Sequence, residues 1–275
     1  MSKIVVCPSS KDNLDKLLNM NIDGIVLGID NLSVFPEYKV DIDKLNDIVK
    51  NTDKEIIVSI NKMIHNKDIP FVEDMLLKLD KINISKIIFY DVGIINIAKR
   101  LGIKKDLVIY GEHLNTSILS NKFYKKHGVS GCLISNDITI DEIKDIKDNT
   151  NMSMMMIAYG YLPMFYSRRY LINNYFEYIG KEKEDNTYYM NHDNEYYMIK
   201  ESEDGTIIYT KKPINLINEI DKLNNIDYLV LDGSYSDDNE FIDVVNSYIN
   251  NDKSNKDEYV GFLHTKTIYK VKNNE

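Results

Sequence analysis

Two adjacent arginines, Arg168 and Arg169, are the residues whose type and spacing most directly indicate chemistry in this sequence. They follow the stretch AYGYLPMFYS, in which an apolar run ends at a glycine and a proline. Arginine guanidinium groups bind carboxylates and phosphates through paired hydrogen bonds. Two interpretations stay open. The pair binds an anionic ligand or an acidic partner chain, or it forms a solvent-facing turn whose charges pair with Glu177 or Asp185.

Further polar residues stand at or just after the ends of short apolar runs, where a parallel barrel places its site. Asp91 and Asp137 are candidate catalytic carboxylates, and His113 is better placed than the other histidines. Each carboxylate has a structural alternative, because an Asp or Asn after a strand is often the N-cap of the next helix. The candidate substrate-binding residues are Asn61, Glu112, Asn115, Tyr159, Arg168 and Arg169, and Asp232 is a further polar residue at a strand end.

Several familiar catalytic patterns are missing from the sequence. It contains no G-x-x-x-x-G-K-[ST] or G-x-G-x-x-G nucleotide-binding loop and no G-x-S-x-G nucleophile elbow. It also contains no H-x-x-x-H or paired Cys/His spacing, so local motifs predict no metal site in this chain.

The elements that must position these residues are short, nearly continuous apolar runs rich in β-branched side chains. Such runs are typical of parallel strands buried on both faces. The predicted strands are Lys3–Pro8, Gly24–Ile29, Glu55–Asn61, Lys86–Asp91, Asp106–Gly111, Gly131–Ser135, Ser153–Gly160 and Asp227–Gly233.

Helical spacing of apolar residues separates most of these runs. The predicted helices cover residues 13–20, 40–51, 70–82, 95–102, 119–128, 139–149, 213–223 and 238–250. Gly102, Gly128 and Asn149 are the expected helix ends. A strand–helix unit repeated about eight times in a chain of this length predicts the α/β class and a TIM-like (β/α)8 barrel.

One segment interrupts this alternation. Residues 176–212 are rich in tyrosine and β-branched residues and contain a polar turn at residues 203–205, which predicts a β-hairpin or small meander inserted after the seventh strand. The predicted division is a barrel over residues 1–250, including this insertion, followed by a polar linker and C-terminal tail over residues 251–275, whose end is expected to be extended.

Charge and cysteine content narrow the function classes. The formal net charge of −9 argues against nucleic-acid binding by this chain alone, although it leaves room for a local basic rim or a basic partner. The sequence has no apolar run of about 18 residues, so no membrane span is predicted. The apolar run in the opening MSKIVVCPSS is too short for a signal peptide. Only two cysteines occur, which does not make a disulfide framework, so we expect a cytoplasmic protein.

The sequence resembles the peptidase U32 family, the collagenase-like proteins, in its short Firmicute form. The resemblance is carried by IAYGYLPMFYSRRYLINNYF (157–176), GEHLNTSILSN (111–121) and YYMIKESEDGTIIYTKKPINLI (196–217), among other segments, and covers most of the chain. It implies a TIM-like barrel. It also places the acidic position that the family carries after the sixth strand on Asp137, where Glu is more usual.

The resemblance implies two activities. One is proteolysis, which the family name implies. The other is oxygen-independent hydroxylation, either of the tRNA wobble uridine with prephenate as the oxygen source or of quinone precursors, by members whose four cysteines hold an iron–sulfur cluster. This chain has Tyr170 where such members have a cysteine, and it has none near Pro163. We therefore expect no cofactor in this chain and a longer, cluster-bearing U32-type partner subunit, with tRNA bound by the complex. The alternatives are a peptidase of unrecognised mechanism and a non-catalytic barrel scaffold.

Overall fold

Eight parallel strands form a closed barrel in the computed structural model, which describes residues 2–266. The order around the barrel is β1-β14-β8-β7-β6-β5-β4-β2, and β2 pairs with β1 to complete the ring. The predicted TIM-like barrel and its eight strands are thereby confirmed. The strands are β1 (Lys3–Cys7), β2 (Gly24–Ile29), β4 (Glu55–Ile60), β5 (Lys86–Phe89), β6 (Asp106–Tyr110), β7 (Gly131–Leu133), β8 (Ser153–Gly160) and β14 (Tyr228–Asp232).

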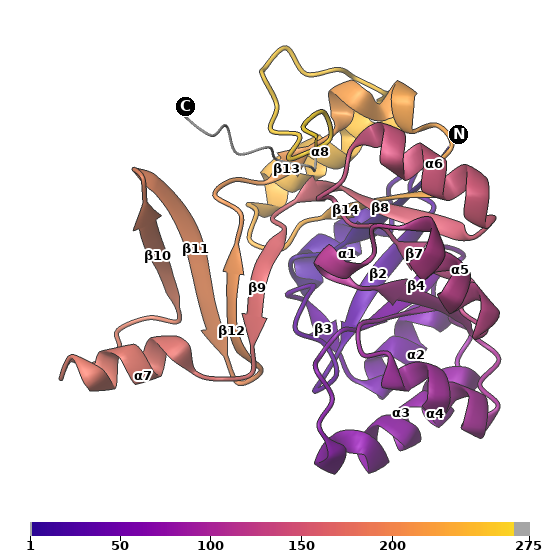
Figure 1. Cartoon of the computed structure of the whole chain (residues 1–275), viewed down its shortest axis with the longest axis horizontal. Helices are drawn as coiled ribbons and strands as arrows, with labels where there is room; N and C mark the ends of the chain where they lie inside the picture. Colours follow the sequence, from indigo (N-terminus) through magenta and orange to yellow (C-terminus); the bar gives the residue numbers. More distant parts are fainter. Residues whose placement is uncertain (1, 267–275) are drawn as a thin grey trace, which may run out of the picture.

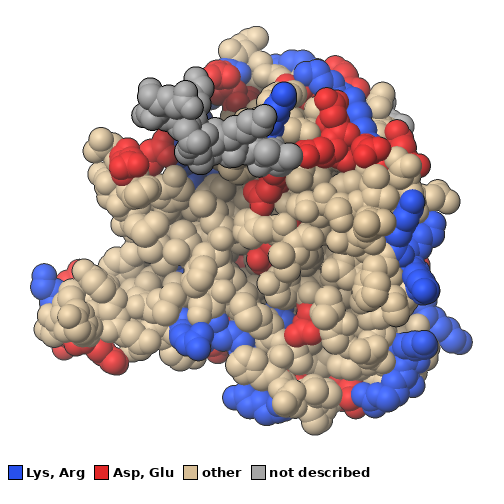
Figure 2. All heavy atoms as spheres, viewed as in Figure 1, with Lys and Arg blue, Asp and Glu red and all other residues tan. Residues whose placement is uncertain are grey.

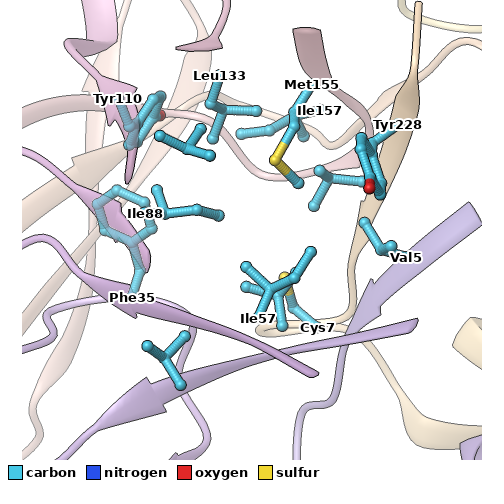
Figure 3. Close-up of a cluster of buried hydrophobic side chains, with 14 of the residues drawn as sticks. Val5, Cys7, Phe35, Ile57, Ile88, Tyr110, Leu133, Met155, Ile157 and Tyr228 are labelled. Carbon is cyan, nitrogen blue, oxygen red and sulfur yellow. The ribbon is translucent and has the colours of Figure 1, made fainter. Parts of the chain in front are cut away.

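The barrel interior is filled with apolar side chains rather than open. Figure 3 shows Val5, Ile57, Ile88, Leu133 and Met155 pointing toward one another from five different strands. All five are less than 5% exposed, which explains why the strand sequences are continuous apolar runs. A ligand therefore cannot enter the centre, and the site must lie at an end of the barrel.

The helices that surround the barrel confirm the predicted alternation, apart from one segment. They are α1 (Lys11–Leu17), α2 (Ile42–Lys50), α3 (Ile69–Lys81), α4 (Gly93–Leu101), α5 (Ile118–Lys126), α6 (Ile140–Thr150) and α8 (Asp238–Asn250), with 3-10 turns η1 (Asn66–Asp68) and η2 (Glu112–Leu114). Gly102 ends α4 at a φ of 69°, and Gly128 follows α5 at a φ of 92°. The expected end at Asn149 was wrong by two residues, because Asn151 adopts the left-handed conformation that ends α6.

The predicted helix over residues 213–223 is replaced by two shorter elements. Strand β13 (Ile214–Asn215) pairs antiparallel with β8, and the 3-10 helix η3 (Ile217–Leu223) follows. The backbone N–H of Leu216 donates to the Ala158 carbonyl at 2.8 Å. This long-range pairing holds the start of the segment in the sheet, so an α-helix cannot begin there.

The insertion after the seventh barrel strand is a four-stranded antiparallel sheet with one helix, and it stands beside the barrel on the left of Figure 1. Its order is β10-β11-β12-β9, so that β9 joins the predicted hairpin segment. The elements are β9 (Pro163–Ser167), α7 (Leu171–Tyr178), β10 (Thr187–His192), β11 (Glu195–Ser202) and β12 (Gly205–Tyr209). A further short strand, β3 (Lys39–Val40), pairs with β2 in the barrel.

Ion pairs fix the insertion to the barrel loops. Asp204, in the turn between β11 and β12, is 4% exposed and accepts from Lys39 at 2.5 Å and from Lys62 at 2.6 Å. Burial raises the pKa of the Asp204 carboxyl, but the hydrogen bonds and charges of the two lysines outweigh burial and lower it overall. The predicted turn is therefore present, and its residues Asp204 and Gly205 are buried against the segments that follow β2 and β4.

The described part of the C-terminal tail returns to the barrel instead of extending away from it. The Asn215 N–H donates to the Tyr259 carbonyl at 2.9 Å, and the Ile140 N–H donates to the Leu263 carbonyl at 3.0 Å. Residues 261–264 form turns, and Leu263 is 2% exposed. The rest of the predicted extended tail lies outside the described residues. The division into a barrel and a separate tail stays a prediction.

Candidate functional site at the carboxyl end of the barrel

A cavity of about 270 Å³ lies where the carboxyl ends of β6, β7 and β8 meet the insertion and the tail. Three parts of the chain that are distant in sequence build its walls. The barrel contributes Tyr110, Glu112, His113, Ser135, Asn136 and Asp137; the β8–β9 connection and insertion contribute Leu162, Pro163, Met164, Tyr197, Thr210 and Lys211; and the tail contributes Tyr259, Gly261 and Phe262.

His113 and Asp137 form a pair in this cavity. The Nδ1 atom of His113 is hydrogen-bonded to the Asp137 carboxylate, and Nε2 lies 3.3 Å from the Met164 carbonyl. A carboxylate and a carbonyl accept hydrogen bonds, so this geometry favours the imidazolium, in which both ring nitrogens are donors. Burial lowers the pKa of His113, but Asp137, Glu112 and the Met164 carbonyl outweigh it and raise the pKa overall.

Glu112 lines the same cavity one residue before His113. Burial raises the pKa of its carboxyl, although the charge of His113 acts in the opposite direction. Its backbone φ of 46° lies in the left-handed region, where a residue with a Cβ is strained by about 1 to 3 kcal/mol. Because left-handed strain in non-glycine residues is concentrated at functional sites, this conformation marks the turn that carries Glu112 and His113.

The cavity can therefore supply proton donors to a bound molecule. His113 is a candidate general acid through Nε2 when a bound molecule replaces the Met164 carbonyl contact at 3.3 Å, with Asp137 holding the ring through Nδ1. Glu112 keeps its proton to a higher pH than an ordinary glutamate. The remaining walls are largely apolar and aromatic, as is usual in pockets for small molecules.

The structure brings together only part of the predicted site. Glu112 and Asp137 line the cavity. Asn115 is fully buried behind it, with its carbonyl accepting from the Ser135 N–H at 3.4 Å and its amide beside the Cys132 thiol.

Asn61 and Asp91 lie at other strand ends and are engaged by neighbouring loops. The Asn61 amide oxygen accepts from the Val34 and Phe35 N–H groups, and its nitrogen donates to the Phe35 carbonyl and to Ser59. All of its hydrogen-bonding positions are therefore occupied. Asp91 accepts from the Gly93 N–H at 2.8 Å, at the first residue of α4.

Tyr159 and the two arginines point to other places. Tyr159 stacks on Phe241 of α8, with 5.9 Å between ring centroids, so it faces the helix layer. Arg168 donates to Asp68 at 2.6 Å and to the Met63 carbonyl at 3.0 Å, which differs from the Glu177 or Asp185 pairing considered above. The side chain of Arg169 is exposed and makes no ion pair within residues 2–266.

Arg168 and Arg169 should consequently differ in their contributions. We expect Arg168→Ala to lower the free energy of unfolding by about 1.5 to 3 kcal/mol, since it removes a charge-assisted hydrogen bond and leaves a carbonyl without its donor. Arg169→Ala, the matched control, should stay within about 0.5 kcal/mol of the wild type. Chemical denaturation of the two variants measures this. Equal stability of both would contradict the structural role of Arg168.

Several cavity residues have only weak signals in the sequence. His113 is recognisable as a histidine after the fifth barrel strand, but its partner is not. Lys211, Tyr259 and Phe262 carry no local pattern and reach the cavity only through the packing of the insertion and the tail.

The protonation of His113 can be measured directly. We expect its pKa to lie above that of free histidine and to fall in Asp137→Asn, because the Asp137 hydrogen bond and charge are the main causes that raise it. Any step that needs the imidazolium is then present at low pH and is lost as pH rises through this raised pKa. Histidine NMR titration of the wild type and the variant measures the change. An unaltered His113 curve in Asp137→Asn would contradict the pairing.

The cysteines do not fit an iron–sulfur cluster. The chain has Cys7 and Cys132 only, whereas such clusters are normally held by four thiolates. Cys7 lies among the apolar side chains of the barrel interior in Figure 3, and β14 and β8 separate its strand from that of Cys132. Burial raises the pKa of Cys7, and it raises that of Cys132 to about 12, so neither thiolate is favoured.

The described residues also show no other metal centre. Within residues 2–266, no group of three or more His, Cys, Asp and Glu side chains could hold a metal ion. None of the helices in that range combines the length and apolar character that a bilayer crossing requires.

Comparison with known proteins decides the family. The model of peptidase family U32 matches residues 9–273. The chain belongs to peptidase family U32. Within this U32 protein, the matched range includes the barrel from α1 onward, the insertion and the cavity residues from all three parts of the chain.

Two curated proteins of Bacillus subtilis (strain 168) are similar to the U32 chain. It is 25% identical to tRNA hydroxylation protein P2 over 274 residues, and this alignment covers 94% of this chain and 88% of P2. It is 25% identical to tRNA hydroxylation protein P1 over 134 residues, and this alignment covers 47% of this chain and 31% of P1.

Solved structures with similar folds are more distant from this U32 chain. Orotidine 5'-monophosphate decarboxylase from Metallosphaera sedula matches 91% of this chain and 100% of its own at 12% identity, with a TM-score of 0.45. The tryptophan synthase A-subunit from Pyrococcus furiosus matches 57% of this chain and 79% of its own at 14% identity, with a TM-score of 0.40.

Proposed function

We propose that this U32 chain is a subunit of a tRNA wobble-uridine hydroxylation system that uses prephenate and no oxygen. The observation that carries the proposal is the similarity to tRNA hydroxylation protein P2 over 94% of this chain and 88% of that protein. The family match over residues 9–273 includes the insertion and the described part of the tail, and these two parts complete the cavity.

The cavity geometry supports a small substrate group. Its volume of about 270 Å³ is near the lower limit of small-molecule pockets, so it suits a single base or a small acid better than a length of peptide. Enzymes that modify a base take it out of the stack and hold it in such a pocket. His113, Asp137 and Glu112 then provide proton transfer at the bound group.

A partner subunit is part of the proposal. The similarity to two distinct tRNA hydroxylation proteins, P1 and P2, supports a system of two chains. The net charge of −9 and the unsuitable cysteines support a longer U32-type partner that holds any iron–sulfur cluster and contributes to tRNA binding. We place this complex in the cytoplasm.

Peptide hydrolysis has less support from the site. In a Ser-His-Asp triad the serine is hydrogen-bonded to the histidine. Here the Ser135 hydroxyl lies 3.4 Å from Asp137, and the distal nitrogen of His113 is directed at the Met164 carbonyl. The arrangement therefore lacks an activated serine, and peptidase activity remains the alternative implied by the family name.

Deletion of the gene tests the proposal. We expect the hydroxylated wobble uridine to disappear from tRNA of the deletion strain and to return when the wild-type chain is supplied. Mass spectrometry of digested tRNA measures both results. A second U32 gene in the same genome would mask the loss, so the measurement is repeated in a strain that lacks both genes. Unchanged modification in that double deletion would refute the proposed function.

A further inference from the structure

A basic surface runs along one side of this acidic protein. Between residues 93 and 130 there are seven Lys and Arg residues and two Asp and Glu residues, a local excess of five positive charges in a chain of net charge −9. Figure 2 shows Lys and Arg side chains gathered along the right-hand edge of the molecule, where α4 and α5 lie in Figure 1. We call this surface the α4–α5 face; its basic residues are Lys99, Arg100, Lys104, Lys105, Lys122, Lys125 and Lys126.

Several of these charges are not used within the protein. Arg100 pairs with Glu73, and Lys125 donates to the carbonyls of Thr150 and Asn151. Lys122 and Lys126 are exposed, and neither makes an ion pair in the part of the chain that the structure describes. Their charges are therefore available to a ligand.

Large apolar side chains are exposed on the same face. Leu119 is 78% exposed and Phe123 is 57% exposed, and the centroid of the Phe123 ring lies 4.4 Å from that of His127. Residues 119, 123 and 127 follow each other at four-residue spacing, so they form one stripe along α5, with Lys122 and Lys126 beside it. An exposed aromatic ring between lysines combines the two kinds of contact that single-stranded nucleic acid uses.

The position of this stripe links it to the cavity. Strand β6 leads through η2, which carries Glu112 and His113, directly into α5. Helix α5 has nine residues and is therefore about 14 Å long. Its first turn is near the barrel mouth, and the lysines of its later turns lie further along the side of the barrel.

We propose that the α4–α5 face binds the RNA backbone next to the base that enters the cavity. Lys122 and Lys126 contact phosphates, and Phe123 stacks on an unpaired base. The identification of this RNA as a tRNA rests on the proposed function. An acidic protein would also be attracted by the lysines, but the exposed aromatic ring between them and the continuity with the cavity favour RNA.

Charge reversal on α5 tests this surface. The variant Lys122→Glu/Lys126→Glu is compared with Lys44→Glu/Lys50→Glu on α2, whose lysines are exposed and make no ion pair among residues 2–266. Both variants change the net charge equally, and each alters one lysine in a last helical turn. The full chain, purified together with any protein that co-purifies with it, is titrated with an unmodified tRNA transcript at about 50 and 200 mM salt.

We expect the α5 variant to bind the transcript at least tenfold more weakly, with a salt dependence reduced by about 0.7 for each phosphate that the variant no longer neutralises. The α2 control should show a much smaller decrease in affinity. Phe123→Ala should weaken binding about fivefold or more without changing the salt dependence, because it removes stacking and leaves the charges. Circular dichroism melting shows whether each variant is folded.

The outcomes that would overturn each proposal differ. Equal decreases in the α5 and α2 variants would overturn the surface, because net charge alone would then explain binding. Unchanged tRNA binding with loss of a co-purifying protein would also overturn it and identify the face as a protein interface. The proposed function is refuted by a different result, namely tRNA hydroxylation that persists in the gene deletion. In that case, a decrease in transcript binding that is specific to the α5 variant would still establish the RNA surface.

Discussion

Asp204→Ala is expected to lower the free energy of unfolding by about 3 to 5 kcal/mol. The carboxylate is 4% exposed and pairs with both Lys39 and Lys62. Removing it leaves two largely buried lysines without an acceptor, and an uncompensated buried charge has a cost of this size. The insertion would lose its main polar attachment to the barrel, and one wall of the cavity would be displaced with it.

Glu203→Ala is the matched control, since Glu203 lies in the same turn and carries the same charge but is exposed. Denaturant unfolding of both variants measures the difference. Because the pKa of Asp204 is lowered in the folded protein, its contribution is fully present above the ordinary carboxyl pKa of 3.8 and is lost as pH falls through the lowered value. Equal stability of the two variants at neutral pH would show that the buried pairs do not hold the insertion.

A third variant tests whether the instability of Asp204→Ala comes from the two lysine charges that it leaves without a partner. In Asp204→Ala/Lys39→Met/Lys62→Met, no buried charge remains at the turn, so much of the stability should return. If the triple variant is as unstable as Asp204→Ala, packing around the turn, rather than the ion pairs, is the stabilising contact.

His113→Ala is expected to reduce hydroxylation of the wobble uridine by about 100-fold or more. General acid–base groups contribute a factor of about 100 to 10,000 to rates, and His113 is the histidine that lines the cavity, paired with Asp137. Asp137→Asn should cause a smaller reduction, since the imidazole stays in place but is without the partner that favours its charged form.

The deletion strain supplied with each variant provides the measurement, by mass spectrometry of digested tRNA at equal protein level. His192→Ala is the control, because His192 lies on β10, exposed and away from the cavity. Normal modification by His113→Ala would remove His113 from the chemistry and leave the cavity as a binding site only. The wild type and Asp137→Asn are also compared across pH. If His113 acts as a proton donor, hydroxylation should be lost at a lower pH in Asp137→Asn than in the wild type, whereas a merely structural histidine would not shift this pH dependence.

The strand sequences determined the barrel. Runs such as GIVLGI and SMMMIAYG are buried along nearly their whole length, so their lack of alternation directly reports burial on both faces. The rule that a barrel carries its site at the carboxyl ends of the strands was sufficient to select Glu112 and Asp137, which line the cavity.

Local patterns failed where distant contacts controlled the backbone. Strand β9 begins at Pro163, and its pairing with β12 follows from the return of the chain about 40 residues later rather than from its own sequence. Residues 213–223 have a helical pattern, yet the pairing of Ile214 with Gly160 holds their first part in the sheet.

The sequence by itself therefore determined the barrel, the place of the insertion and the end of the barrel that holds the site. Only the tertiary structure decided which side chains meet there. Arg168 and Arg169 are adjacent in sequence, but Arg168 contacts Asp68, 100 residues away, and Arg169 is exposed. Periodicity reports which face of an element is buried, because burial follows the geometry of that element. The convergence of His113, Lys211 and Phe262 depends on loop conformations that long-range packing selects, and no local pattern records it.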